Sequence, residues 1–333
     1  MEPSSGIKAT LTSVIKNKMT PIILVLIAMC VFASVFSPYF LTAYNLGSLV
    51  RDIAFIGLIT LGQACLLLIG EIDLSVGNIA ALCGVVGGML MVFGKVNPFL
   101  ALALCLVLGA VLGFINGTIV TRLKLNSMVV TIGMSGVYAG LNLVMTKGKA
   151  VENIPKDIYF LGQGFLFGIP MPFVIMLILM IIVLFLVKFT QFGRYLYAIG
   201  NNKEAAKILG IKVNIIRTLA FSLTGLLSAL AGILMVSRLG TSQPSIGTDW
   251  PLNSIAASVI GGVSMTGGLG NPFGAFIGAT IICVISNLIV LFGVDPYWQT
   301  AVSGIVVVVA ISIDSISMMM AAKQKLIKKL KDN

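Results

Sequence analysis

The feature that most constrains this chain is a series of long, uninterrupted apolar segments, of which residues 173–187 are one example. Hydrophobic residues make up 58% of the chain and charged residues only 10%, whereas a soluble domain is typically about a quarter charged. A water-soluble fold cannot bury this much apolar surface. In lipid, backbone groups must pair internally, which leaves helices or a closed barrel. Because the apolar runs do not alternate with polar residues as barrel strands do, we predict an all-α, polytopic transmembrane helical bundle.

The spacing of the apolar runs indicates how often the chain crosses the bilayer. A hydrocarbon core of about 30 Å needs about 20 apolar residues per helix. The sequence predicts about ten spans, at residues 20–37, 52–70, 74–94, 98–120, 127–146, 170–188, 215–237, 253–265, 272–292 and 298–318. The eighth is short and rich in glycine, so we expect a broken or partial span there.

The distribution of basic residues predicts the orientation. With ten alternating spans and the N-terminus in the cytoplasm, the cytoplasmic segments hold sixteen of the 22 Lys and Arg residues. This satisfies the positive-inside rule. We therefore expect a cytoplasmic segment at 1–19, a transmembrane domain at 20–320 with a cytoplasmic loop at 191–214, and a basic cytoplasmic tail at 321–333.

Several kinds of site are disfavoured by composition. Histidine is absent, and the five cysteines all lie inside apolar runs without a CxxC pair, so they are expected to pack rather than bind metal. The glycine-rich stretch 261–278 lacks the GK[ST] tripeptide of a phosphate-binding loop. We expect no catalytic residue, no metal and no cofactor bound by this chain. The net charge of +11 is read as a topology signal rather than as a nucleic-acid surface.

Glycines recur every four residues within the predicted spans, as in Gly109, Gly113 and Gly117. Small residues at this spacing allow close helix packing in lipid. Helix packing alone does not explain two stretches, which are GEIDLSVG at 70–77 and the dense glycines of 261–278. The first is either a tight cytoplasmic turn in which Asp73 caps the next helix, or a broken helix beside a transport path.

These motifs resemble one known family. GEIDLSVG, the loop GRYLYAIGNNKEAAKILGI at 193–211, the run at 222–247, the glycines of 261–278 and the segment 291–314 are similar, in order, to the ribose-type ABC sugar permeases of bacteria. One departure is Glu71, where such permeases usually carry Gly.

The resemblance implies the membrane subunit of an ATP-driven importer in the bacterial plasma membrane, forming the path for a ribose-like monosaccharide. It implies a second permease copy or a paralogue, as a homodimer or heterodimer. It also implies an extracytoplasmic sugar-binding protein and a separate double-cassette ATPase that uses ATP and Mg.

The loop 191–214 is the expected contact with that ATPase. Its EAAxxxG spacing predicts a short helix with small alanines for close docking and a glycine that ends it. The resemblance implies a coupling role for Gly193, Asn201, Glu204, Ala205, Ala206 and Gly210.

The translocation path needs polar groups within the spans, and the candidates are Asn116, Thr131, Asn142, Ser258 and Asn287. Each could equally satisfy a neighbouring helix backbone. The gate is expected at the two glycine-rich breaks, through Asp73, Ser75, Gly77, Gly261, Gly262, Gly268 and Gly270.

Other functions remain open. A proton-coupled secondary transporter would need intramembrane acids, of which Asp314 is the candidate. A membrane enzyme would need a cluster of ionisable groups that the sequence lacks. Within the ABC class, autoinducer-2, nucleoside and branched-chain amino-acid permeases are the close alternatives.

Overall fold

The computed structural model describes residues 19–295, 298–302, 304–309, 312, 316 and 319–320. Its elements in chain order are α2 (Thr20–Phe36), α3 (Ala43–Leu68), α4 (Val76–Val92), α5 (Pro98–Arg122), α6 (Ser127–Thr146), η1 (Lys156–Ile158), α7 (Tyr159–Gln163), β1 (Phe165–Leu166), β2 (Ile169–Pro170), α8 (Met171–Phe189), α9 (Gln191–Asn201), α10 (Lys203–Ile208), α11 (Val213–Leu239), α12 (Trp250–Ile260) and α13 (Pro272–Leu291). Helical residues also occur at 298–302 and 304–309. The basic tail, Asp314 and nearly all of the N-terminal segment lie outside the described residues.

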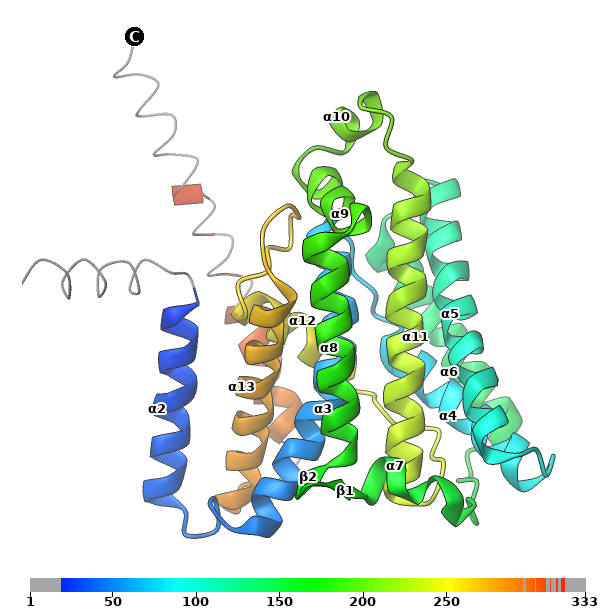
Figure 1. Ribbon diagram of the computed structural model, residues 1–333, viewed down its shortest axis with the longest axis vertical. Helices are drawn as coiled ribbons and strands as arrows, with labels where there is room; N and C mark the ends of the chain where they lie inside the picture. Colours follow the sequence, from blue (N-terminus) through cyan, green and yellow to red (C-terminus); the bar gives the residue numbers. More distant parts are fainter. Residues whose placement is uncertain are drawn as a thin grey trace, which may run out of the picture.

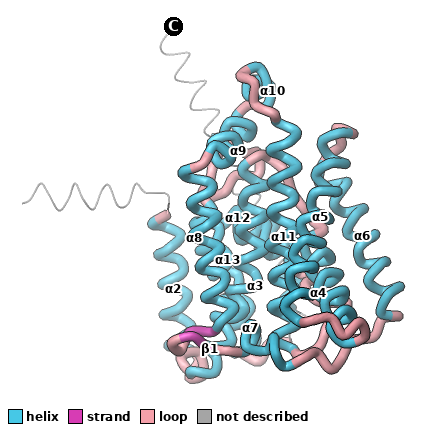
Figure 2. Tube along the Cα trace, turned by 45° about the vertical axis from the view of Figure 1, so that its right-hand side comes forward, coloured by secondary structure: helices cyan, strands magenta, loops and turns pink. Residues whose placement is uncertain are grey.

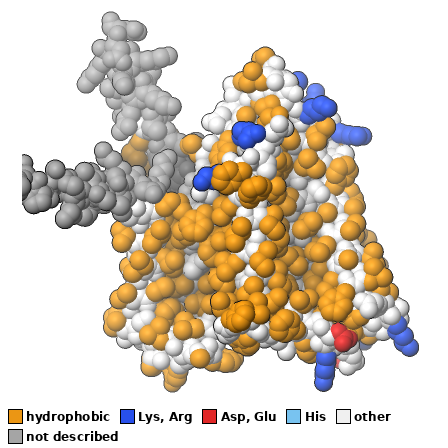
Figure 3. Space-filling model, viewed as in Figure 1, with side chains coloured by type: hydrophobic (Ala, Val, Ile, Leu, Met, Phe, Trp, Pro, Cys, Tyr) orange, Lys and Arg blue, Asp and Glu red, His pale blue; other side chains and the backbone are white. Residues whose placement is uncertain are grey.

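The described part of the chain is a bundle of long helices (Figures 1 and 2). Six helices are long and apolar enough to cross a membrane, namely α3, α5, α6, α8, α11 and α13, and α2 and α4 are shorter but also apolar. On the face seen in Figure 3, apolar side chains cover the middle of the bundle and the basic ones lie towards its two ends. The predicted helical membrane bundle is confirmed, with the small antiparallel hairpin β1–β2 as an addition. The number of spans, about ten, stays a prediction.

Two central helices organise the bundle. α3 and α11 have most of their residues buried. α11 packs on α3, α4 and α5, while α3 also contacts α8, α12 and α13. These contacts place the core along the line where the two helices meet.

Glycine permits the closest of these contacts. A Cβ at Gly109 of α5 would lie 2.5 Å from the carbonyl oxygen of Gly225 on α11, and a Cβ at Gly113 would overlap the carbonyl oxygen of Phe221. The backbones of α5 and α11 can approach this closely only because these positions carry no side chain. The packing role predicted for the glycine repeat is therefore confirmed.

The bundle has two different ends. The α10 end carries α9, α10, the connection between α3 and α4, and the loop 261–271. The α7 end carries η1, α7 and the β1–β2 hairpin (Figure 1). At the α7 end, the backbones of Val151 and Ser242 exchange two hydrogen bonds of 2.9 Å, which join the loop after α6 to the loop after α11.

Two helix boundaries differ from the prediction. α3 begins at Ala43, nine residues before the expected 52, because the Thr42 hydroxyl accepts the backbone N–H of Asn45 at 3.3 Å and starts the helix among polar residues. α12 runs from Trp250 to Ile260 rather than 253–265. Its 11 residues extend about 16 Å, about half of a bilayer core, as expected for a partial span.

Candidate functional site

The connection between α3 and α4 is irregular but buried. Gly70 takes a left-handed conformation, with φ of 72°, that ends α3. Beyond it, the backbone N–H of Ile72 donates to the Ser127 hydroxyl at 3.2 Å, and that of Leu74 donates to the Thr131 hydroxyl at 3.0 Å. Two side chains of α6 thus satisfy backbone donors that a regular helix would pair internally. Thr131, one of the predicted path residues, therefore binds the backbone of this connection.

Asp73, in the same connection, is the centre of a buried polar network. One of its carboxylate oxygens accepts the Ser75 N–H at 2.7 Å and the Ser75 hydroxyl at 2.6 Å. The other accepts the Asn116 side-chain amide at 3.3 Å, and Asn116 also donates to the Ser75 hydroxyl at 2.8 Å. The Tyr138 hydroxyl completes the network by donating to the side-chain oxygen of Asn116 at 2.8 Å. The carboxylate is fully enclosed and held by several donors, which joins α4, α5 and α6.

The expected cap of α4 by Asp73 is wrong in detail. The N-cap residue of α4 is Ser75, and its own side chain makes no capping bond. Asp73 binds the N-cap residue instead of the first turn of the helix. Its carboxylate therefore shapes the connection before the helix, where the backbone turns.

Gly77 links this connection to a loop from the second half of the chain. A Cβ at Gly77 would overlap the carbonyl oxygen of Gly247, in the loop before α12. Gly247 has a φ of 76° and lines the polar pocket described next. The start of α4 therefore lies directly against the wall of that pocket.

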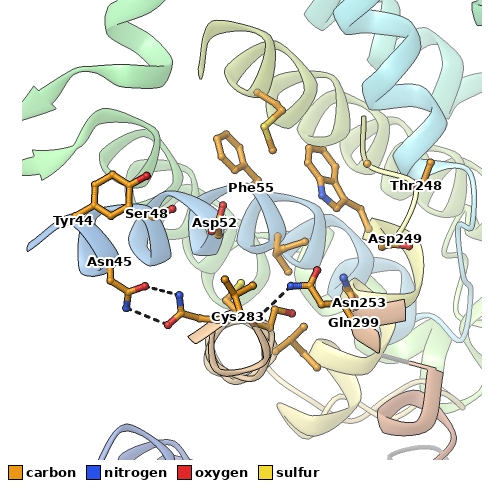
Figure 4. A pocket seen from close by; sticks show the side chains of 18 residues that line it. Tyr44, Asn45, Ser48, Asp52, Phe55, Thr248, Asp249, Asn253, Cys283 and Gln299 are labelled. Carbon is orange, nitrogen blue, oxygen red and sulfur yellow. Dashed lines mark hydrogen bonds between the residues drawn. The ribbon is translucent and has the colours of Figure 1, made fainter. Parts of the chain in front are cut away.

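A polar pocket of about 500 Å³ opens between α3, α13 and the start of α12 (Figure 4). Asn287 is the one predicted path residue on its wall, where it exchanges two amide hydrogen bonds with Asn45, of 2.8 and 3.1 Å. The other polar side chains on the wall are Tyr44, Ser48, Asp52, Thr248, Asp249, Asn253, Ser286 and Gln299.

One side of the pocket is aromatic. The rings of Phe55 and Trp250 lie nearly parallel, with centroids 6.3 Å apart.

Charged and amide groups lie beside these rings. Arg238 forms an ion pair with Asp52, and its guanidinium lies 5.5 Å from the centre of the Phe55 ring. Asn253 has a buried side-chain oxygen without a hydrogen-bond partner among the described residues. Carboxylate and amide groups beside an aromatic face suit a neutral solute with several hydroxyl groups.

The remaining predicted path residues lie away from this pocket. The Asn142 amide donates to the Pro244 carbonyl oxygen at 3.0 Å, and the Ser258 hydroxyl donates to the Ser254 carbonyl oxygen at 2.8 Å. Asn116 belongs to the Asp73 network. In each case the polar group satisfies a partner inside the protein.

The glycines of the loop 261–271 allow three segments to meet at the α10 end. The Gly268 N–H donates to the Leu68 carbonyl oxygen at the end of α3, at 2.9 Å, and the Tyr197 hydroxyl of α9 donates to the Gly270 carbonyl oxygen at 2.8 Å. A Cβ at Gly268 would lie 2.7 Å from the side-chain oxygen of Asn201. We call this contact of α3, α9 and the loop the glycine junction. The other two predicted gate glycines contact different helices: Gly261 ends α12 against Gly274 of α13, and Gly262, with a φ of 83°, lies near Ile22 of α2.

The predicted coupling loop forms two short helices. Gly193 of α9 packs so tightly on the backbone of Val187 that a Cβ would overlap it. Asn201 lies at the last position of α9, next to the glycine junction. Asn202 caps α10 by accepting the Ala205 N–H at 2.9 Å, and Gly210, with a φ of 81°, follows the end of α10.

The alanines of α10 point in different directions. Glu204 and Ala205 are exposed, but Ala206 is only 2% exposed because it packs inward. Ala206 therefore cannot provide a docking surface as expected. Ile208 and Leu209, which are not among the predicted coupling residues, are 86% and 79% exposed at the tip of the loop. The sequence signal for this surface is an apolar pair within a basic loop.

No group of three or more Cys, Asp or Glu residues among the described residues is arranged to hold a metal ion. The five cysteines are free, and four of them are buried in the apolar core.

Comparison with known proteins finds membrane permeases of import systems. Residues 45–311 match the family model described as "Branched-chain amino acid transport system / permease component". The ribose import permease protein RbsC of Bacillus subtilis is 40% identical over 291 residues, covering 87% of this chain and 90% of the relative. RbsC of Haemophilus influenzae is 35% identical over 294 residues, covering 87% and 91%. The autoinducer 2 import system permease protein LsrC of Escherichia coli is 33% identical over 298 residues, covering 90% and 87%. No solved structure matches the chain.

The family match covers the break after α3, the predicted coupling loop, the glycine junction and nearly all of the polar pocket. Three observations indicate a membrane permease: the long apolar helices, the family match over most of the chain and the identity to import permeases. The chain belongs to the family of multi-pass membrane permeases that includes the ribose and autoinducer 2 import permeases.

Proposed function

We propose that this chain is the membrane-spanning subunit of an ATP-binding-cassette importer and forms the path for a monosaccharide such as ribose. The observation that carries this is the 40% identity to a ribose import permease over 87% of the chain. The polar pocket supports it, because its amides, carboxylates and stacked rings offer partners to sugar hydroxyl groups and to the apolar face of a sugar ring.

The chain would work as a path without its own energy source. The ATP and Mg would be used by a separate double-cassette ATPase, and an extracytoplasmic binding protein would deliver the sugar. Two permease chains, identical or paralogous, would complete the path in the bacterial plasma membrane. In the proposed topology of ten spans, both termini and the α10 end face the cytoplasm, since the basic loop 191–214 lies at that end.

Movement at the ATPase would reach the pocket through packed contacts. The tip of α10 offers Ile208 and Leu209 to the ATPase, and α9 touches the glycine junction. The junction holds the end of α3, and the connection after α3 leads to Gly77, which touches Gly247 on the pocket wall. Left-handed glycines along this route can turn without a side-chain clash, which suits a gate.

The test is uptake into proteoliposomes that contain the permease, its ATPase and its binding protein. Labelled ribose should accumulate only when ATP is inside, and a protonophore should have no effect. Uptake that stops with the protonophore while ATP stays high would identify a proton-coupled transporter instead.

A second substrate is favoured by one observation, the 33% identity to the autoinducer 2 permease. Competition decides between the two. Unlabelled autoinducer 2 should leave ribose uptake unchanged if ribose is the substrate.

A further inference from the structure

A second polar cavity, of about 510 Å³, lies at the α10 end between α10, the end of α5 and the start of α11. Glu204 is the one acidic residue on its wall. The basic residues on the wall are Lys124, Lys203, Lys207, Lys212 and Arg217. Five cations and one carboxylate make this cavity strongly positive.

Arg217 is the buried member of this group, at 5% exposure. One of its terminal nitrogens pairs with Glu71. Its Nε–H is also buried and has no hydrogen-bond partner among the described residues. Because a buried N–H without a partner costs free energy, the Arg217 guanidinium is only partly satisfied by Glu71.

The positive charges of this cavity are close enough to affect one another. Desolvation, followed by the nearby Arg217 guanidinium, lowers the pKa of Lys203 below its ordinary value. Glu71 and Glu204 offset this only in part. An anion in the cavity would relieve the repulsion between these cations.

The cavity also has an apolar side, formed by Ile211, Val213 and Ile215. It lies where α5 ends and α11 begins, so it is placed at the boundary between the apolar helices and water. Such a cavity suits an anion that carries an apolar part, and an anionic phospholipid has both.

We propose that this cavity binds a phosphate-bearing anion, held by Arg217 and the surrounding lysines, with a phospholipid headgroup of the adjoining leaflet as its source. The inference goes beyond the proposed function and does not depend on the transported solute. Arg217 supplies the directional donor, and the lysines supply charge. The positive-inside rule explains basic residues at this end, but it requires neither a shared cavity nor a buried N–H without a partner.

The test uses the full-length permease in an uncharged detergent, with calorimetric titration. The probes are short-chain phosphatidylglycerol, phosphatidylcholine with the same chains, and inorganic phosphate. Lys203→Gln/Lys207→Gln removes two charges from the cavity, and both side chains are exposed, so folding should be retained. Arg122→Gln/Arg194→Gln is the matched control, since it removes two exposed charges from the same end but outside this cavity.

We expect phosphatidylglycerol to bind more tightly than phosphatidylcholine, and the cavity variant to weaken its binding by about tenfold. The control variant should change the affinity by less than about twofold. Binding of inorganic phosphate alone, with the same dependence on Lys203 and Lys207, would support the site and assign it to a soluble anion. Equal loss of affinity in both double variants, or no binding of either anion, would overturn the proposal. Melting temperatures of the variants show whether each one is folded.

Discussion

Glu71 and Arg217 form a buried ion pair that ties the connection between α3 and α4 to the first turns of α11. Glu71 is 9% exposed and Arg217 is 5% exposed. Glu71 belongs to the GEIDLSVG stretch at 70–77, so this pair fixes the motif against α11. Its charge is thus matched within this chain by a partner 146 positions away.

The ion pair predicts a large effect when only one partner is removed. Glu71→Gln leaves the Arg217 charge buried without its partner, so we expect a loss of stability of about 3–5 kcal/mol. Thermal unfolding in detergent measures it. Glu152→Gln, at an exposed acid, is the control and should change little. Equal melting temperatures for both variants would show that the pair contributes nothing.

The Asp73 network predicts a structural role for Asn116, which the sequence suggested as a path residue. Asn116→Ala removes donors to Asp73 and Ser75 and an acceptor for Tyr138, so we expect a loss of about 2–3 kcal/mol of stability. Tyr138→Phe removes the hydroxyl that lies 2.8 Å from the Asn116 side-chain oxygen and 3.2 Å from the Leu112 carbonyl oxygen, and should cost about 1 kcal/mol. For protein that remains folded, the KM for uptake should stay within about twofold of wild type, because Asn116 does not line the pocket. A large rise in KM without a change in stability would show that Asn116 contributes to the transport path.

The tip of α10 predicts where the ATPase docks. Leu209→Asp places a charge on an exposed apolar side chain, and we expect at least about thirtyfold weaker binding of the ATPase. Pull-down or titration with the purified ATPase measures this. Phe167→Asp is a control at the α7 end, where the side chain is 96% exposed. If Leu209→Asp binds the ATPase as wild type does, docking lies elsewhere.

The glycine junction predicts slow transport when its backbone is restricted. A Cβ at Gly270 would lie 2.6 Å from the Cα of Val263, and its φ of 132° suits only glycine. Gly268→Ala and Gly270→Ala should each reduce uptake several-fold without preventing membrane insertion. Gly133→Ala is the control, since no side chain or backbone from another part of the described chain lies within 4 Å of its Cβ position. Normal uptake by both junction variants would exclude the junction as a gate.

The membrane bundle was predictable because apolar runs report burial in lipid directly. The start of α3 was not, because Asn45, Ser48 and Asp52 lower the hydropathy of its first turns although they face a polar pocket. Hydropathy cannot distinguish a loop from a helix whose polar side chains have partners in the fold. α12 ends at Ile260 rather than 265 because Gly261 and Gly262 follow it, and Gly262 takes a left-handed conformation with a φ of 83°.

The path residues were harder to predict than the helices. Thr131, Asn142 and Asn287 are all polar residues within apolar helices, and they look alike in sequence. Thr131 and Asn142 satisfy distant backbone groups, while Asn287 lines the pocket. The difference lies in partners far away in the chain, so only the three-dimensional arrangement separates them.

If the polar pocket is the path of an ATP-driven sugar importer, a bulky side chain at Ser286 on its wall should block transport. The measurement is ATP-driven ribose uptake into proteoliposomes by Ser286→Phe, which fills the pocket, and by Ser286→Ala, which does not. We expect Ser286→Phe to lower uptake by at least about tenfold while ATPase binding is kept, and Ser286→Ala to transport nearly as wild type. Ribose uptake at the wild-type rate by folded Ser286→Phe would show that the sugar does not pass through this pocket.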